Sequence, residues 1–296
     1  MAVMAKAEGM IAVRGGRVWY RIEGRDKAGV PVLIVHGGPG APHDYLESLA
    51  ALADERPVVF YDQLGCGNSD HPDDPTLWTT GRFVAELAAV RAALGLEELH
   101  ILGQSWGTML AVEYMLAEKP RGVRSLVLTA PFLSAPRWIA DQRAYLAAMP
   151  AEVRRAVAEA EAKGDYESPA YQEAVTAFYK RHLCVLDPWP EAMERAFAKM
   201  GIPVYLSMFG PSEFTATGCL KEVDLVGRLK EITVPALFTC GSLDEATPAA
   251  TELYHRALPG SELAVFADAA HQHHLEKPDE YLATVRGFLA RAEGRG

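Results

Sequence analysis

Ser105 occupies the centre of the pentapeptide Gly103-Gln104-Ser105-Trp106-Gly107. A serine hydroxyl can attack an acyl carbon when a neighbouring base removes its proton. The preceding residues 99–102 are largely apolar and rich in branched side chains, which predicts a buried strand, and residues 108–118 contain good helix formers. A G-x-S-x-G between a strand and a helix is typical of a nucleophile elbow, a tight turn that lifts the serine oxygen clear of the sheet.

The chain also supplies a base and an orienting acid, in the order that enzymes with this elbow use. Residues 236–240 read as a strand after a proline, and Asp244 follows on the next loop. Residues 263–266 read as the last strand, with His271 shortly after it. We expect His271 to act first as general base and then as general acid, while Asp244 fixes the tautomer of the imidazole and stabilises the imidazolium.

Two further histidines leave alternatives open. His273 is the alternative base, whereas His271 is preferred because it comes first after the strand and precedes the helix that Pro278 opens. A histidine-rich tract can also bind metal, and His271, His273 and His274 supply three imidazoles. No cysteine or carboxylate nearby has a matching metal spacing, so the serine triad is preferred over zinc and no cofactor is expected.

A second glycine-rich motif, HGGPG at residues 36–40, directly follows the predicted strand 32–35. Acyl transfer requires backbone N–H groups aimed at the developing oxyanion. One donor comes from the residue after the nucleophile, here Trp106, and the other from the loop after an early strand. We predict Gly37 as that second donor, with Gly38 as the alternative.

Composition limits the partners. The 296 residues include 29 Lys and Arg against 39 Asp and Glu, a formal net charge of −10, which argues against nucleic acid or an anionic membrane and suits cationic N-termini. No apolar run approaches the length of a membrane span. The four cysteines are widely spaced and form no Cys-x-x-Cys pair, which predicts free thiols in a cytoplasmic enzyme.

The elements around these motifs predict an α/β fold with a mostly parallel central sheet and helices on both faces. Residues 10–13 and 18–22 flank a glycine pair, a hairpin signal, and strands then alternate with helices at 44–53 and 81–94. From residue 132 to 231 helical periods dominate, at 135–148, 151–162, 169–182 and 191–200. We therefore expect a core of residues 1–131 and 232–296 that is interrupted by a helical cap at 132–231.

These motifs together resemble the prolyl aminopeptidases, also called proline iminopeptidases, of the α/β-hydrolase fold. The resemblance rests on HGGPG at 36–40, DQLGCGNS at 62–69 and GQSWG at 103–107, and it runs from about Gly9 to the C-terminus. The segment GPSEFT at 210–215 and the pair Asp244-Glu245 are most similar to the branch that contains tricorn-interacting aminopeptidases. Leu64 stands where many members of the family carry arginine. The residues around His271 also differ from the commonest pattern of the family.

The resemblance implies a serine aminopeptidase with Ser105, Asp244 and His271 as its triad. It also implies that Glu213 and Glu245 hold the α-ammonium group of the substrate, which a carboxylate can do through a charge-assisted hydrogen bond. The expected substrates are short peptides or amino-acid amides with a free N-terminus. Two alternatives remain open: an amino-acid amidase or a hydrolase that removes an aminoacyl group from a small metabolite, and a ligand-binding receptor on the same fold.

Overall fold

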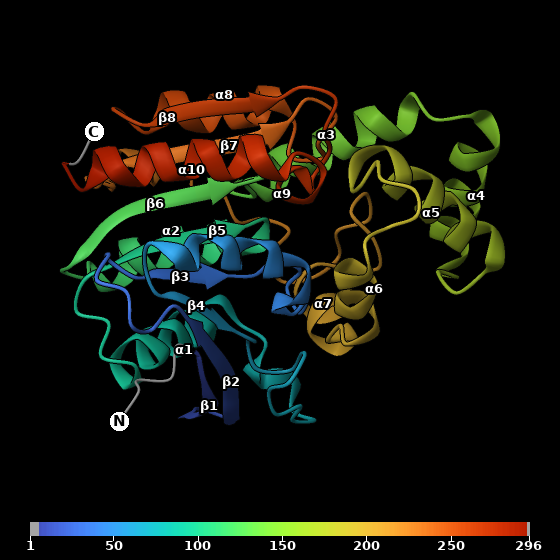
Figure 1. The fold of residues 1–296 in the computed structure, drawn as a ribbon. Coiled ribbons are helices and arrows are strands. Elements are labelled where there is room, and N and C mark those ends of the chain that lie inside the picture. The colour runs from blue at the N-terminus through green and yellow to red at the C-terminus, as the bar shows by residue number, and fades with distance from the viewer. Residues whose placement is uncertain (1–5, 295–296) are drawn as a thin grey trace.

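The structure is a computed structural model that describes residues 6–294, and its centre is an eight-stranded sheet (Figure 1). The strands lie in the order β1-β2-β4-β3-β5-β6-β7-β8. Strand β2 is antiparallel to both of its neighbours, and the other pairings are parallel. The strands are β1 (Lys6–Val13), β2 (Gly16–Glu23), β3 (Val32–Val35), β4 (Val58–Tyr61), β5 (Leu99–Gln104), β6 (Val123–Thr129), β7 (Ala236–Gly241) and β8 (Glu262–Phe266).

Helices cover both faces of the sheet because successive side chains of a strand point to opposite sides. In β3, Leu33 and Val35 pack in one apolar cluster, whereas Val32 and Ile34 pack in another. The first cluster includes side chains of α1 (Thr80–Ala93), α2 (Trp106–Glu118) and α8 (Pro248–Ala257). The second contains side chains of the 3₁₀ helix η1 (His43–Asp54) and of α10 (Pro278–Ala292).

A helical segment lies between β6 and β7, and the arrowheads of β3 and β6 point toward the side of the molecule that holds its helices α4 to α7 (Figure 1). The two ends of the segment meet: Ser134 and Asp224 form an antiparallel bridge, and the Leu225 N–H donates to the Leu133 carbonyl at 2.9 Å. Its helices are α3 (Ala135–Ala147), α4 (Ala151–Lys163), α5 (Pro169–His182), α6 (Glu191–Ala198) and α7 (Ile202–Met208).

This segment has an apolar core of its own, in which side chains of α3, α4 and α5 pack around Tyr171 and Phe178. The 3₁₀ helix η3 (Val226–Glu231) packs instead against α2 and α8 of the main body. The predicted boundary at residue 231 stays a prediction. Because η3 contacts the main body, we use "the cap" for residues 132–225.

Most predicted elements are present, with two differences. The predicted helix at 44–53 is the 3₁₀ helix η1, whose first residue, His43, donates its N–H to Asp62 Oδ1 at 2.8 Å. Helix α7 was not predicted, because its seven residues include a proline and too few turns to show a period. None of the helices within residues 6–294 combines the length and hydropathy that crossing a bilayer requires.

Candidate active site

Ser105 lies at the sharp turn between β5, which ends at Gln104, and α2, which begins at Trp106. Its backbone has φ 54° and ψ −123°, a left-handed conformation that is strained for a residue with a side chain. The flanking glycines are required by space: a Cβ at Gly103 would lie 2.4 Å from the Gly107 carbonyl oxygen, and one at Gly107 would lie 2.0 Å from that of Val35. The turn thus has the geometry of a nucleophile elbow.

Asp244 and His271 are hydrogen-bonded, with 2.7 Å between Asp244 Oδ1 and His271 Nδ1, and both side chains are buried. Asp244 follows β7, and His271 follows β8, so both lie beyond the carboxyl ends of neighbouring strands. Backbone N–H groups of Gly241 and Ala246 also donate to the Asp244 carboxylate, at 3.2 and 2.7 Å. A proton held on Nδ1 by this carboxylate leaves Nε2 as the basic nitrogen.

The carboxyl end of β5 lies at the same edge of the sheet, two strands from β7. Ser105, Asp244 and His271 therefore all follow parallel strands at this edge, where open α/β sheets build their sites. The geometry joins Asp244 to His271, and the approach of the Ser105 hydroxyl to His271 Nε2 stays a prediction.

The two other histidines have separate partners. His273 lies 2.9 Å from Thr239 Oγ1 through Nε2, and burial lowers the pKa of its imidazole well below the ordinary value. His274 Nε2 donates to the Tyr45 carbonyl at 3.0 Å, and burial lowers the pKa of His274 to about 4. Both rings therefore have structural bonds inside the protein, so His271 is the better candidate for the base.

The choice between Gly37 and Gly38 as oxyanion donor stays a prediction, and the hydrogen bonds of the loop favour Gly38. Its N–H donates to the Tyr45 hydroxyl at 2.7 Å, and that hydroxyl donates to Gln104 Oε1 at 2.6 Å. The Gly37 N–H is therefore committed to an internal acceptor, whereas the Gly38 N–H has none among residues 6–294. The loop is close to the nucleophile, since a Cβ at Gly37 would lie 3.0 Å from the Ser105 Cβ. Gly38 replaces Gly37 as the candidate donor beside Trp106.

The sequence analysis did not identify a role for Tyr45. Its hydroxyl joins the glycine loop to Gln104, the residue before Ser105. We expect Tyr45→Phe to lower kcat about 10-fold with KM nearly unchanged, because the Gly37 N–H and Gln104 Oε1 lose a buried partner and the loop loses its alignment. Steady-state kinetics on prolyl p-nitroanilide measure this. Tyr61→Phe is the matched control, because the Tyr61 hydroxyl is buried without a partner in the described part of the chain. Equal kcat in both variants would contradict the alignment role.

A second network fixes the elbow from the side of the helix. The Trp106 indole N–H donates to Gln63 Oε1 at 3.0 Å, and the Gln63 amide N–H donates to the His36 carbonyl at 2.9 Å. The Gln63 backbone N–H donates to His36 Nε2 at 2.8 Å. The three motifs that carry the family resemblance therefore contact one another through Trp106, Gln63 and His36.

Of the two predicted glutamates, Glu245 lies beside the histidine. Glu245 Oε1 is 3.5 Å from His271 Nε2, and Glu245 Oε2 is buried without a hydrogen-bond partner among the described residues. Glu213 comes from the cap, is half-buried, and accepts a hydrogen bond of 2.5 Å from the Tyr205 hydroxyl. The structure therefore places Glu245 against the Asp244–His271 pair and bonds Glu213 to Tyr205 of the cap, and the joint role of the two carboxylates stays a prediction.

Burial raises the pKa of both carboxyl groups, because it disfavours their charged forms. It raises the pKa of Glu245 well above the ordinary value of 4.5, and the charges of Glu213 and Asp244 raise it further. Burial also raises the pKa of Glu213, although the Tyr205 hydrogen bond and the nearby His271 act in the opposite direction. A cation that binds here would relieve this mutual repulsion. The site is thus chemically suited to an ammonium group beside an acyl-transfer centre.

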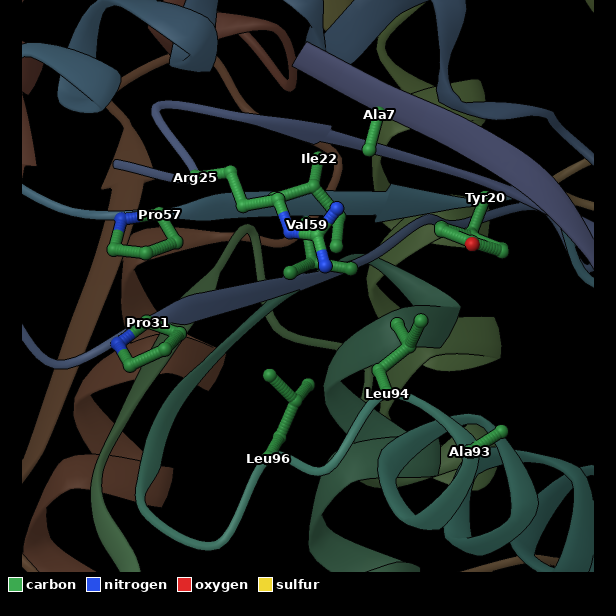
Figure 2. Close-up of a pocket in the computed structure, with 10 residues that line it drawn as sticks. All are labelled: Ala7, Tyr20, Ile22, Arg25, Pro31, Pro57, Val59, Ala93, Leu94 and Leu96. Atoms are coloured by element: carbon green, nitrogen blue, oxygen red, sulfur yellow. The ribbon is translucent and has the colours of Figure 1, made fainter. Parts of the chain in front are cut away.

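A cavity of about 280 Å³ lies elsewhere, between β2, β4 and the end of α1 (Figure 2). Pro31 and Pro57, which line it, precede β3 and β4 and so mark the amino ends of those strands. Its lining combines apolar side chains with polar groups, among them Tyr20 and Arg25. It is therefore separate from the site at the carboxyl ends.

Comparisons with known proteins agree with this geometry. A family model described as alpha/beta hydrolase fold matches residues 30–278. A protein named proline iminopeptidase from Heyndrickxia coagulans is 46% identical over 283 residues, which cover 95% of this chain and 98% of the relative. The crystal structure of proline iminopeptidase from Mycobacterium smegmatis matches with a TM-score of 0.89 and 37% identity, covering 97% of this chain and 98% of that one. The crystal structure of VinJ matches with a TM-score of 0.93 and 33% identity. The match covers 97% of this chain and 99% of the VinJ chain.

Proposed function

The chain belongs to the proline iminopeptidase family of α/β-hydrolases, and from this premise we propose that it is a serine aminopeptidase that releases N-terminal proline, or another small apolar residue, from short peptides. One observation carries the proposal: the buried Asp244–His271 pair lies within 3.5 Å of a Glu245 carboxylate whose second oxygen lacks a partner among the described residues. Such a site combines a base for acyl transfer with a receptor for a free amine.

In this mechanism His271 Nε2 removes the Ser105 proton, and the Ser105 oxygen attacks the first peptide carbonyl carbon. The N–H groups of Trp106 and Gly38 stabilise the resulting oxyanion. His271 then gives its proton to the departing amine, the peptide C–N bond breaks, and an aminoacyl ester forms on Ser105. Water, deprotonated by His271, hydrolyses that ester and restores the Ser105 hydroxyl.

The carboxylates restrict this chemistry to the end of a chain. Glu245 directly follows the triad acid in the sequence, while Glu213 reaches the site from the cap, so the two approach the substrate from separate elements. We propose that both accept hydrogen bonds from the α-ammonium group, about one residue from the carbonyl that Ser105 attacks. An acetylated N-terminus has no positive charge and would leave the buried Glu245 and the half-buried Glu213 facing a neutral amide.

The assay that tests this function compares prolyl p-nitroanilide with its N-acetyl derivative. The proposal predicts rapid release of p-nitroaniline from the free amine, and a kcat/KM at least about 100-fold lower for the acetylated substrate, because it lacks the charge-assisted hydrogen bonds. Comparable rates on both would contradict recognition of the amine.

The raised pKa values of the glutamates predict a pH dependence. Below its pKa a glutamate is neutral and loses its attraction for the ammonium group. We therefore expect the ratio of kcat/KM for prolyl p-nitroanilide to that for p-nitrophenyl acetate to fall with decreasing pH, beginning above 4.5, since burial shifts both pKa values upward. The ester shares the triad and serves as the internal control. A ratio that does not change between about pH 5 and pH 8 would contradict ionised glutamates as the amine receptor.

The second candidate is an amino-acid amidase or a hydrolase that removes an aminoacyl group from a small metabolite. What supports it is that the proposed receptor, Glu213 and Glu245, binds only the amine, and the proposal assigns no residue to the departing group. Kinetics on prolyl and alanyl p-nitroanilides, amides and dipeptides separate the two functions. A kcat/KM for amides above that for peptides would favour the amidase.

A further inference from the structure

Three successive backbone carbonyls of the loop after β7 each accept a hydrogen bond from a different side chain of the cap. They belong to the triad acid, to the residue before it and to the glutamate after it. The bonds run from His182 Nδ1 to the Leu243 oxygen at 2.8 Å, from Tyr145 Oη to the Asp244 oxygen at 3.2 Å and from Gln142 Nε2 to the Glu245 oxygen at 2.7 Å.

The donors reinforce one another. Tyr145 of α3 stacks on His182 of α5, with ring centroids 4.0 Å apart and planes 11° from parallel. The His182 carbonyl also accepts backbone N–H groups from Glu245 at 3.3 Å and from His271 at 3.1 Å. His182 therefore contacts the loop of the acid and the loop of the base at once, from the last residue of a cap helix.

The bond to the Glu245 carbonyl is the one hydrogen bond that the Gln142 side chain forms among the described residues. Its side chain is fully buried, and its Oε1 has no hydrogen-bond partner in the described part of the chain. Burying an amide costs free energy unless its groups are hydrogen-bonded. The bond to the Glu245 carbonyl offsets part of that cost. An apolar side chain of the same size would fit the position without leaving an oxygen unbonded.

Holding consecutive carbonyls fixes consecutive peptide planes, and these planes set the direction of the side chains between them. The loop has left the sheet at this point, so no neighbouring strand can hold these groups. The donors come from two cap helices: α5 and the last turn of α3 pack in the apolar cluster of the cap, while the start of α3 packs in the cluster that includes the sheet.

We propose that Gln142, Tyr145 and His182 are positioning residues, through which the docked cap sets the orientation of both Asp244 and Glu245. The inference rests on the proposed function, since it concerns the same triad and the same amine receptor. It makes the cap part of the catalytic alignment: a cap that shifts away from the sheet would disturb the acid and the amine receptor together.

Two variants test the proposal on prolyl p-nitroanilide and on p-nitrophenyl acetate, which has no amine. Gln142→Met removes the donor to the Glu245 carbonyl at similar volume, and we expect about a 10-fold higher KM for the prolyl substrate with the ester little changed. Tyr145→Phe removes the donor to the Asp244 carbonyl, and we expect a several-fold lower kcat on both substrates, because the acid that orients His271 moves. Ala144→Gln, on the exposed face of the same helix, is the control.

Different outcomes test the positioning role and the proposed function. Wild-type kinetics in both variants would overturn the positioning role. Equal losses on both substrates in Gln142→Met would also overturn it. If the wild-type protein did not hydrolyse prolyl p-nitroanilide, the proposed function would be overturned instead. Thermal unfolding of each variant shows whether it is folded. Tyr145→Phe loses only one hydroxyl, so it keeps the proposal testable if Gln142→Met does not fold.

Discussion

Ser105→Ala is expected to lower kcat/KM for prolyl p-nitroanilide by roughly 10⁴-fold or more, because no other group can form the aminoacyl ester. The loss should fall on kcat, since the carboxylates that bind the amine remain in place. Stability should change little or fall slightly, because the left-handed backbone at this position suits alanine no better than serine. Hydrolysis measured at high enzyme concentration and thermal unfolding together check this expectation.

Ser207→Ala is the matched control for that experiment. Ser207 is an exposed serine on α7 of the cap, so its replacement should leave kcat/KM within about 2-fold of wild type. If Ser105→Ala kept more than about a tenth of the wild-type rate, an acyl-enzyme on Ser105 would be excluded.

Glu245→Gln is expected to lower kcat/KM for prolyl p-nitroanilide about 100-fold and to leave p-nitrophenyl acetate within a few-fold of wild type. The substitution keeps the shape of the side chain and removes the charge that would pair with the α-ammonium group. It also removes the repulsion from Glu213 and Asp244 that raises the pKa of Glu245, so the folded protein should be no less stable. Kinetics on the two substrates and thermal unfolding give the comparison.

Glu252→Gln on α8 serves as the control, because Glu252 forms an exposed ion pair with Arg256 and such pairs contribute little. Equal losses on the amine and the ester in Glu245→Gln would mean that Glu245 acts on the triad and not on the substrate. That result would refute its assignment as amine receptor while leaving the triad intact.

The sheet and the elbow could be predicted because their signals are local. The apolar strands before Ser105 and Asp244 are short runs that periodicity identifies, and glycines on either side of Ser105 indicate the tight turn directly. Helices α3, α4 and α5 of the cap were predicted at nearly their observed bounds, since each begins and ends with ordinary signals.

What could not be predicted depends on partners distant in the chain. Our preference for Gly38 over Gly37 rests on the Tyr45 hydroxyl, and nothing in the glycine motif indicates where that hydroxyl lies. The bond from Gln142 to the Glu245 carbonyl joins residues 103 positions apart. Periodicity shows that Gln142 lies on a helix, but only the packing of the cap shows which carbonyl it meets.

The family resemblance narrowed the function further than the physical pattern alone. A triad and an oxyanion loop indicate acyl transfer, whereas the role of Glu213 and Glu245 was implied only by the resemblance. That role stays a prediction. The structure is compatible with it, since Glu245 lies 3.5 Å from His271 Nε2 and burial raises the pKa values of both glutamates. The narrower resemblance to the tricorn-interacting branch stays a prediction.

The most direct test is active-site titration with diisopropyl fluorophosphate, followed by mass spectrometry of the proteolytic peptides. Our account predicts one phosphoryl group per protein, attached to Ser105, with prolyl p-nitroanilide hydrolysis lost in proportion to labelling. Complete inactivation with the label on another residue, or full activity with Ser105 labelled, would contradict it.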